Sequence, residues 1–128
     1  MISDNEEIDV LYNNCHGGWG ISDKARELYI LRKTKNSNNK RRTDPILIQI
    51  YNELGDEFDD KYSSSAIAKI PKKYENYYYI SEYDGLEKIE IDYTKYELDN
   101  LKKNIKEILE NNSIDNYEKI NQFKKMSI

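Results

Sequence analysis

The stretch Cys15-His16-Gly17-Gly18-Trp19-Gly20-Ile21-Ser22 joins an alternating apolar segment to the start of an amphipathic one. The segment before it, residues 8–13, has the period of two expected of a strand with one strongly buried face. After it, Ser22 can accept a hydrogen bond as a helix N-cap, and Asp23 places a favourable charge in the first turn. These residues predict a strand-to-helix junction, with the helix running to about Lys33.

The apolar face of this first helix is expected to contain Ala25, Leu28 and Tyr29, with Ile30 and Leu31 widening the stripe. Six basic residues and no acidic one lie between Arg32 and Arg42, among Asn and Ser. Such a composition cannot bury itself, so we expect a solvated loop in this part of the chain. Contact of these basic side chains with a nucleic-acid backbone is the less favoured alternative.

A second helix is predicted to begin at Asp44, which can cap it, and Pro45, which suits the first helical position. Its apolar residues follow at i, i+3, i+4 and i+7, namely Leu47, Ile50, Tyr51 and Leu54. Gly55 is expected to end the helix in the left-handed conformation. The polar and acidic residues 56–65 then predict a loop.

Three more strands are expected, over residues 66–70, 77–80 and 86–91. Asp84-Gly85 lies before the last of them and predicts a tight hairpin, because both central residues of such a turn need a positive φ. We expect these three strands to pair with one another as an antiparallel group.

The C-terminal part of the sequence predicts helices. Thr94 and Glu97 have the spacing of a capping box, and a long helix to about Asn111 should follow. Its apolar residues have a 3-4-3 spacing that could also pair with a second copy of the chain: Leu98, Leu101, Ile105 and Ile108. A tail helix is expected around residues 114–123.

Together these elements predict an α+β fold. We expect a small antiparallel or mixed sheet with two N-terminal helices packed on it, and a C-terminal helical extension. The predicted core domain covers residues 1–93, and the charged helical extension covers residues 94–128.

Composition limits the classes of function. The 128 residues fit one core, and 20 Lys and Arg against 24 Asp and Glu give a net charge of -4, which creates no global attraction for nucleic acid or acidic membranes. No apolar run is long enough for a membrane span, and the acidic first ten residues do not resemble a signal peptide. Cys15 is the single cysteine and His16 the single histidine, which fits a reducing compartment.

The glycine-rich junction has two interpretations. Free backbone N–H groups at a helix start can bind a phosphate or carboxylate, with Arg41 and Arg42 folding over it. However, the sequence lacks the Lys and the third glycine of nucleotide-binding loops, and Asp23 would repel an anion. The other interpretation is a tight turn in which the glycines accommodate the backbone and Trp19 packs on the core.

The residue types suggest further candidate sites. Cys15 near a helix N-terminus could be a nucleophile, but no second histidine can act as its base, so a buried structural thiol is favoured. Tyr77, Tyr78 and Tyr79 could stack bases or fill a sheet face. The acidic pairs show no metal-loop spacing and are interpreted as solvated surface: Asp56 with Glu57, Asp59 with Asp60, and Glu82 with Asp84. We expect no catalytic residue, no metal and no cofactor.

Several segments in order resemble an uncharacterised family of small proteins of phages and large DNA viruses. The matching pieces are Cys15 to Ser22, Arg42-Thr43-Asp44-Pro45, Glu53-Leu54-Gly55, Lys69-Ile70-Pro71 and Glu82-Tyr83-Asp84-Gly85-Leu86-Glu87. The resemblance covers roughly residues 8–91 and implies a viral origin and a domain boundary, but no reaction. Its members often carry Tyr at the position of His16, and the helices from Thr94 onward extend beyond the family pattern.

We therefore expect a virus- or phage-encoded accessory protein that acts as a non-enzymatic interaction module on a host or viral partner. A binder of a small phosphorylated or nucleotide ligand and a small enzyme using Cys15 are the alternatives. The expected location is the host-cell cytoplasm, with virion association left open, and the partner is expected to be neither nucleic acid nor a membrane. The candidate binding residues are Cys15, His16, Gly17, Gly18, Trp19, Gly20, Ser22, Arg41, Arg42, Tyr83 and Asp84.

Overall fold

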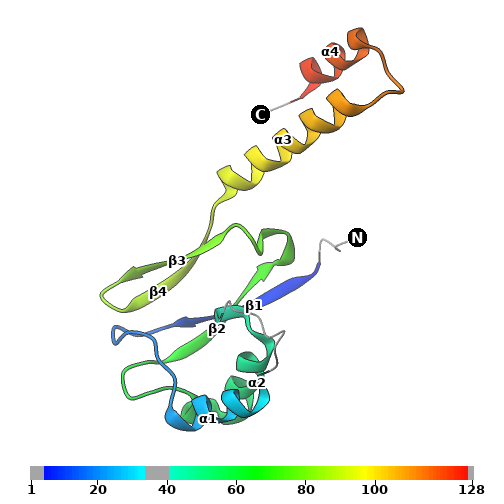
Figure 1. Cartoon of the computed structure of the whole chain (residues 1–128). Helices are drawn as coiled ribbons and strands as arrows, with labels where there is room; N and C mark the ends of the chain where they lie inside the picture. The colour runs from blue at the N-terminus through cyan, green and yellow to red at the C-terminus, as the bar shows by residue number, and fades with distance from the viewer. Residues whose placement is uncertain (1–4, 34–40, 127–128) are drawn as a thin grey trace. The chain divides into compact units, whose positions relative to one another are not determined.

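The computed structural model of the chain describes residues 5–33 and 41–126 and has an α+β fold (Figure 1). It divides into two compact units, Met1–Ile91 and Asp92–Ile128. The described helices and strands are β1 Glu7–Asn13, α1 Asp23–Arg32, α2 Pro45–Leu54, β2 Ser65–Pro71, β3 Tyr78–Tyr83, β4 Leu86–Ile91, α3 Tyr93–Glu110 and α4 Asn116–Lys125.

The strands form two separate two-stranded antiparallel sheets, β1 with β2 and β3 with β4. Within the expected antiparallel group of β2, β3 and β4, the pairing of β3 with β4 is confirmed, but the inclusion of β2 is wrong, because β2 pairs with β1. The register places Leu11 opposite Ile67 and Val10 opposite Ala68. Successive residues of a strand face opposite sides, so each side of this ribbon carries apolar side chains that need cover.

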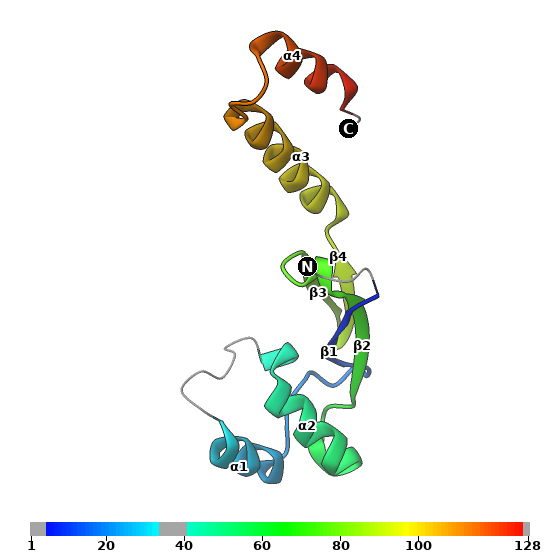
Figure 2. The same cartoon turned by 90° about the vertical axis from the view of Figure 1, so that its right-hand side faces the viewer.

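One side of the β1–β2 ribbon is covered by α1 and α2, and the β3–β4 hairpin lies on the other side (Figures 1 and 2). The core on the helix side contains the buried residues Leu11, Ile21, Ala25, Leu47, Ile50 and Phe58, and Trp19 packs against it. The expected packing of Trp19 on the core is confirmed. β4 contacts β1, which joins the two sheets into one unit.

The first helix begins as predicted, with the Ser22 side chain accepting a hydrogen bond from the Ala25 amide. Ala25 is buried, whereas Leu31 is 81% exposed and Ile30 is also exposed. The expected widening of the apolar stripe by these two residues is therefore wrong. Of α1, only Ala25, Leu28 and Tyr29 join the core, so its packed face is narrower than expected.

The second helix confirms its predicted cap and start, since the Asp44 carboxylate accepts from the Ile46 amide and Pro45 is the first helical residue. Asp44 is fully buried, and the Tyr29 hydroxyl donates to its Oδ2 at 2.5 Å, which links α1 to the start of α2. Gly55 ends the helix with φ +56 but ψ -124, so it does not take the left-handed helical conformation that was expected.

Two further expectations from the sequence need correction. Residues Gly55–Phe58 form a 3₁₀ turn that buries Phe58 completely, so the acidic segment 56–65 is not a plain surface loop. The Thr94–Glu97 capping box is also wrong, because α3 is capped by Asp92, whose carboxylate accepts from the Lys95 amide. Part of the expected basic loop, residues 34–40, lies outside the described residues.

Candidate functional site

The glycine-rich junction meets the Asp84–Gly85 turn, although the two motifs lie far apart in the sequence. A Cβ atom on Gly85 would come within 2.6 Å of the Gly18 backbone nitrogen and 2.7 Å of the His16 carbonyl. The His16 ring Nδ1 lies 3.3 Å from the Asp84 carbonyl oxygen. Asp84 and Gly85 have φ +51 and +86, which confirms the predicted hairpin turn. The two turns therefore form one structural site.

Asn13, a fully buried side chain at the end of β1, holds these two turns together. Its Nδ2 donates to the carbonyl oxygens of Cys15, at 2.9 Å, and Gly85, at 2.8 Å. Its Oδ1 accepts from the Ser64 amide at 2.9 Å. The Asn13 side chain thus bonds backbone groups of three separate segments and positions them relative to one another. The sequence alone does not predict this role.

The other side of the junction runs along residues 58–64. The Ser22 amide donates to the Phe58 carbonyl, and the Asp60 amide donates to the Gly20 carbonyl. A Cβ atom on Gly17 would lie 1.8 Å from the Tyr62 carbonyl oxygen, and one on Gly20 would lie 2.0 Å from the Asp60 carboxylate. Backbone packing against this neighbouring segment accounts for Gly17, whereas at Gly20 the side-chain carboxylate of Asp60 occupies the space of a Cβ atom.

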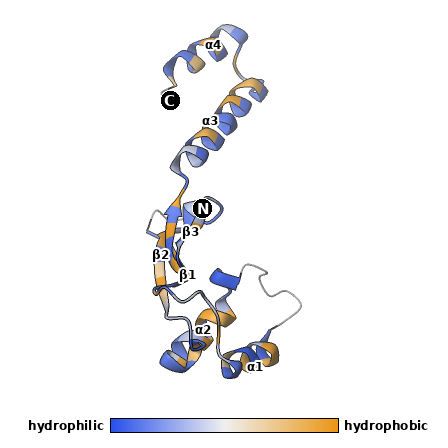
Figure 3. Cartoon of the chain, turned by 90° about the vertical axis from the view of Figure 1, so that its left-hand side faces the viewer, coloured by the Kyte–Doolittle hydropathy of each residue, from blue (hydrophilic) through white to orange (hydrophobic). Residues whose placement is uncertain are grey.

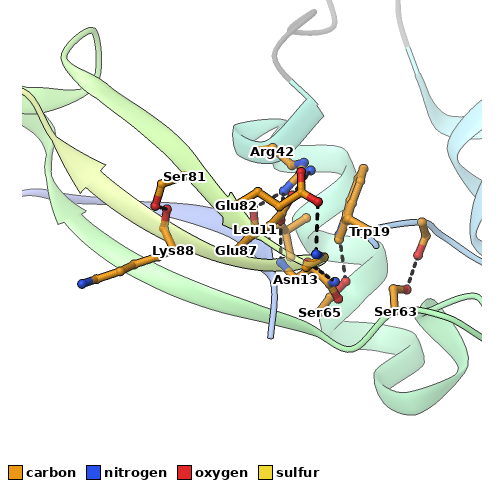
Figure 4. Close-up of polar contacts among 12 residues, drawn as sticks. Leu11, Asn13, Trp19, Arg42, Ser63, Ser65, Ser81, Glu82, Glu87 and Lys88 are labelled. Carbon is orange, nitrogen blue, oxygen red and sulfur yellow. Dashed lines mark hydrogen bonds and ion pairs between the residues drawn. The ribbon is translucent and has the colours of Figure 1, made fainter. Parts of the chain in front are cut away.

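Arg42 lies beside the junction but is already engaged (Figure 4). Its guanidinium carbon lies 3.9 Å from the centre of the Trp19 ring. The guanidinium also makes two hydrogen bonds with the Glu87 carboxylate, at 2.6 and 3.0 Å, and a third with the Leu11 carbonyl. The Arg42 side chain is 21% exposed and that of Glu87 is 9% exposed, so this is a largely buried, bidentate pair.

The ionised state of Glu87 is favoured by its surroundings. Burial raises the pKa of Glu87, but the hydrogen bonds from Arg42 and from the Asn13 amide, together with the Arg42 charge, outweigh it. The net result is a pKa below the ordinary value of a glutamate. Glu87 therefore stays charged and keeps Arg42 in place at neutral pH.

Trp19 is held by a hydrogen bond at its indole nitrogen and by guanidinium groups over its ring. Its indole Nε1 donates to the Ser65 hydroxyl at 3.0 Å, and this hydroxyl donates to Asp59 Oδ1 at 2.5 Å. Arg41 also lies over the ring, with its guanidinium carbon 5.4 Å from the centroid. The result is a stacked arrangement of one indole and two guanidinium groups at the side of the junction.

Cys15 and Ser22 have structural partners. The Cys15 thiol is half-buried, less than the buried thiol that was expected, and its Sγ lies within donating distance of two acceptors, Asn13 Oδ1 at 3.4 Å and the Tyr62 carbonyl oxygen at 3.3 Å. The Ser22 hydroxyl donates to the Glu57 carbonyl at 2.6 Å while it caps α1. The contacts of both residues hold backbone segments together.

The exposed part of this site is a surface that we call the tip, defined by His16, Tyr62, Tyr83 and Asp84. Tyr62 is 59% exposed and Tyr83 is 79% exposed. The Tyr62 backbone contacts Cys15 and Gly17, and Tyr83 precedes the turn that meets His16. Tyr62 was missed from the sequence because it belongs to the acidic segment interpreted as a loop.

A groove of about 510 Å³ opens between the two sheets beside the tip. Tyr12 and Ala68 line it from the β1–β2 ribbon, and Tyr83, Leu86 and Ile89 line it from the hairpin. Apolar side chains thus form much of its wall, while carboxylates and a lysine contribute the rest: Glu82, Glu87 and Lys88.

The remaining candidate residues are placed as follows. Asp59 and Asp60 accept hydrogen bonds from Ser63, Ser65 and the Tyr62 amide. Within residues 5–33 and 41–126, no three His, Cys, Asp or Glu side chains gather as a metal-binding group. In the same ranges no helix is both long and apolar enough to cross a bilayer.

The chain was compared with protein-family models, with curated proteins and with solved structures, and none of the three comparisons found a match.

Proposed function

We propose that this protein is a non-enzymatic interaction module that binds a protein partner through the tip. The observation that supports the proposal is the meeting of the two turns, which brings His16 and Asp84 together, with the exposed side chains of Tyr62 and Tyr83 on the adjoining segments. The polar groups beneath this surface are engaged with one another, as the bonds of Asn13 show. A rigid base that presents exposed tyrosines is the arrangement expected of a recognition surface.

The two tyrosines supply the chemistry of the proposed contact. Tyrosine combines a large apolar ring with a hydroxyl that can hydrogen-bond, and it is enriched among the residues that dominate binding energies. Tyr62 and Tyr83 are among the most exposed large side chains of the first unit. The His16 ring and the Asp84 carboxylate add polar groups at the same place, which suits a partner with a mixed apolar and polar face.

A viral setting for this partner is part of the proposal. Its support is the resemblance of residues 8–91 to a family of phages and large DNA viruses, and the abundance of Lys, Ile, Asn and Tyr, which AT-rich codons favour. The protein would then be an accessory protein that engages a host or viral protein in the cytoplasm of the host cell.

The test uses affinity purification followed by a direct binding measurement. The wild-type chain is used to isolate a partner from infected cells, and the purified partner is then titrated calorimetrically with variants. Tyr62→Ala/Tyr83→Ala is expected to weaken binding at least ~30-fold, because interface hot spots contribute about 2 kcal/mol or more. Tyr79→Ala is the matched control, since Tyr79 is an exposed tyrosine of β3 outside the tip. Equal affinities of the double variant and the wild type would refute the proposal.

A phosphorylated ligand is the second candidate, and the position of Arg41 favours it. Arg41 is exposed and lies over Trp19 beside the junction. Arg42, in contrast, is occupied by Glu87 and could bind an anion only by giving up this pair. A thermal-shift series with ADP, ATP and inorganic phosphate tests the idea, since a ligand at 100 times its Kd should add about 2.7 kcal/mol of stability. An unchanged Tm with all three would remove this candidate.

A further inference from the structure

We propose that α3 and α4 form a dimerisation element that pairs with the same two helices of a second copy of this chain. The two helices contact each other, and the Lys119 ammonium donates to the Leu109 carbonyl oxygen at 2.9 Å. α4 therefore folds back along α3 as a helical hairpin, which Figure 2 shows clearly.

This hairpin leaves its own apolar side chains uncovered. Among the described residues of α3 and α4 none is buried. Besides Tyr93 at the start of α3, which is 56% exposed, four large apolar side chains, two from each helix, are between 48% and 73% exposed: Leu98, Leu109, Tyr117 and Ile120. Figure 3 shows hydrophobic residues interspersed with hydrophilic ones along both helices.

The lengths of the two helices explain part of this exposure. α3 has 18 residues and α4 has 10. At 1.5 Å per residue these are about 27 and 15 Å long, so α4 can reach along only about half of α3. The α3 turn that carries Leu98 therefore lacks a partner helix within the hairpin.

This helical unit does not stabilise itself by burial, since neither α3 nor α4 has a buried residue among those described. No cysteine lies in it, since Cys15 is the single one of the chain. Packing two such hairpins into a four-helix bundle would bury the apolar side chains of both.

Net charge does not oppose a second copy as the occupant. Between Asp92 and Met126 there are seven basic and seven acidic residues, so this part of the chain has no net charge. A neutral, mixed surface does not repel its own copy, and it offers no field that would select a nucleic acid or an anionic lipid. A symmetric dimer needs only that the same patch be used twice.

The surface area that such a pairing would bury is also sufficient for a specific dimer. Burying the four exposed side chains with their neighbours on two copies would remove on the order of 1,000 Å² of surface, which is the lower end of specific interfaces. We therefore expect a dimer that dissociates on dilution, in contrast to an obligate one.

The experiment is sedimentation and light scattering of the full chain over a range of concentrations. The expected mass at the highest concentration is twice the 15.3 kDa of the chain, with dissociation on dilution. The Leu98→Lys/Ile120→Lys variant should be monomeric at every concentration tested. Its dimerisation should be at least tenfold weaker than that of the wild type, because two charges per copy would be placed in the interface. Leu31→Lys is the matched control, since Leu31 is an exposed leucine at the end of α1, and it should dimerise like the wild type.

Three results would overturn the proposal. The first is a wild-type chain that stays monomeric at all concentrations, including the case in which hydrogen exchange shows the hairpin protected within the monomer. The second is dimerisation that survives in Leu98→Lys/Ile120→Lys, and the third is its equal loss in Leu31→Lys. A second variant, Leu109→Lys/Tyr117→Lys, should also be monomeric and guards against misfolding of the first pair. None of these substitutions lies in the tip. The outcome of the dimerisation experiment is therefore independent of the outcome of the partner-binding test proposed for the tip.

Discussion

Single residues hold the site together, and the Arg42–Glu87 pair is one of the connections they make. The pair connects the turn before α2 to β4, and its groups also bond the Leu11 carbonyl and the Asn13 amide of β1. A pair of this kind is strongly destabilising to break, because the remaining charge stays in a poorly hydrated place.

Replacing Glu87 by Gln should lower the free energy of unfolding by about 3 kcal/mol at pH 7, since Arg42 would lose its counter-charge. Urea unfolding of the two proteins measures the difference. Glu53→Gln is the control, because Glu53 makes an exposed ion pair with Arg32 at 2.7 Å, and it should cost under about 1 kcal/mol. Similar losses of unfolding free energy in Glu87→Gln and Glu53→Gln would contradict a larger stabilising role for the Arg42–Glu87 pair.

The stabilisation by Glu87 should depend on pH in a defined direction. Its pKa in the folded protein is below the ordinary value, so its carboxylate stabilises the native state fully above the unfolded pKa of about 4.3. That contribution disappears as the pH falls through the lower, folded value. The stability difference between the wild type and Glu87→Gln should therefore be constant from pH 7 to about 5.5 and should shrink below the unfolded pKa. A stability difference between the two proteins that grows on acidification would show that the pKa of Glu87 is raised in the folded protein.

Glycine positions in the junction should differ in their tolerance of a side chain. Gly17→Ala should destabilise the protein by more than about 2 kcal/mol, because the new Cβ would collide with the Tyr62 backbone. Gly18→Ala should cost only about 1–2 kcal/mol, because Gly18 has φ +80 but open space around it. Thermal unfolding of both variants measures the contrast, and the reverse order would contradict the packing described for Gly17.

At the scale of elements, the described helices begin where short polar side chains can accept hydrogen bonds. Ser22, Asp44, Asp92 and Asp115 each accept from a backbone amide of the helix that follows. These local signals are readable from the sequence, and the first two were identified from it. The third was misassigned because Thr94, two residues after Asp92, has the spacing of a capping box with Glu97.

The cap of α3 can be tested by comparing two alanine substitutions. Asp92→Ala should speed hydrogen exchange of the first-turn amides of α3, by an amount equivalent to about 1 kcal/mol, because the Lys95 amide loses its acceptor. Thr94→Ala should leave this exchange nearly unchanged, since Thr94 lies within the helix. Faster exchange in Thr94→Ala than in Asp92→Ala would restore the capping-box assignment.

At the scale of the whole molecule, the two compact units differ in how they are stabilised. The first has a buried core in which Phe58 packs edge-on against Tyr51, with ring centres 5.3 Å apart. The helices of the second have no buried residue among those described. The first unit should therefore carry most of the stability of a single copy.

A chain ending at Ile91 should fold with a Tm within a few degrees of the full chain under dilute conditions. Phe58→Ala should lower the stability of both lengths equally, by about 3–5 kcal/mol, because it removes a fully buried ring from the first unit. Calorimetry of the four proteins tests this. A truncated chain that fails to fold would mean that the second unit is part of the core.

The sequence by itself determined the features that depend on a few neighbouring residues. The strand before the junction, the starts of α1 and α2 and the Asp84–Gly85 turn follow from alternation, caps and the backbone preferences of Asp and Gly. The residues of the candidate site were also identified in large part, because the glycine-rich turn and the Asp-Gly turn are distinctive locally.

Only the tertiary structure decided which distant segments meet. The pairing of β2 with β1, the burial of Phe58, the bonds of Asn13 and the partnership of Arg42 with Glu87 join residues that are far apart along the chain. Such contacts depend on how whole surfaces fit when apolar area is buried, and no local pattern encodes their partners. For this reason Arg42, which could be a free anion-binding group in the sequence, is a paired structural residue in the fold.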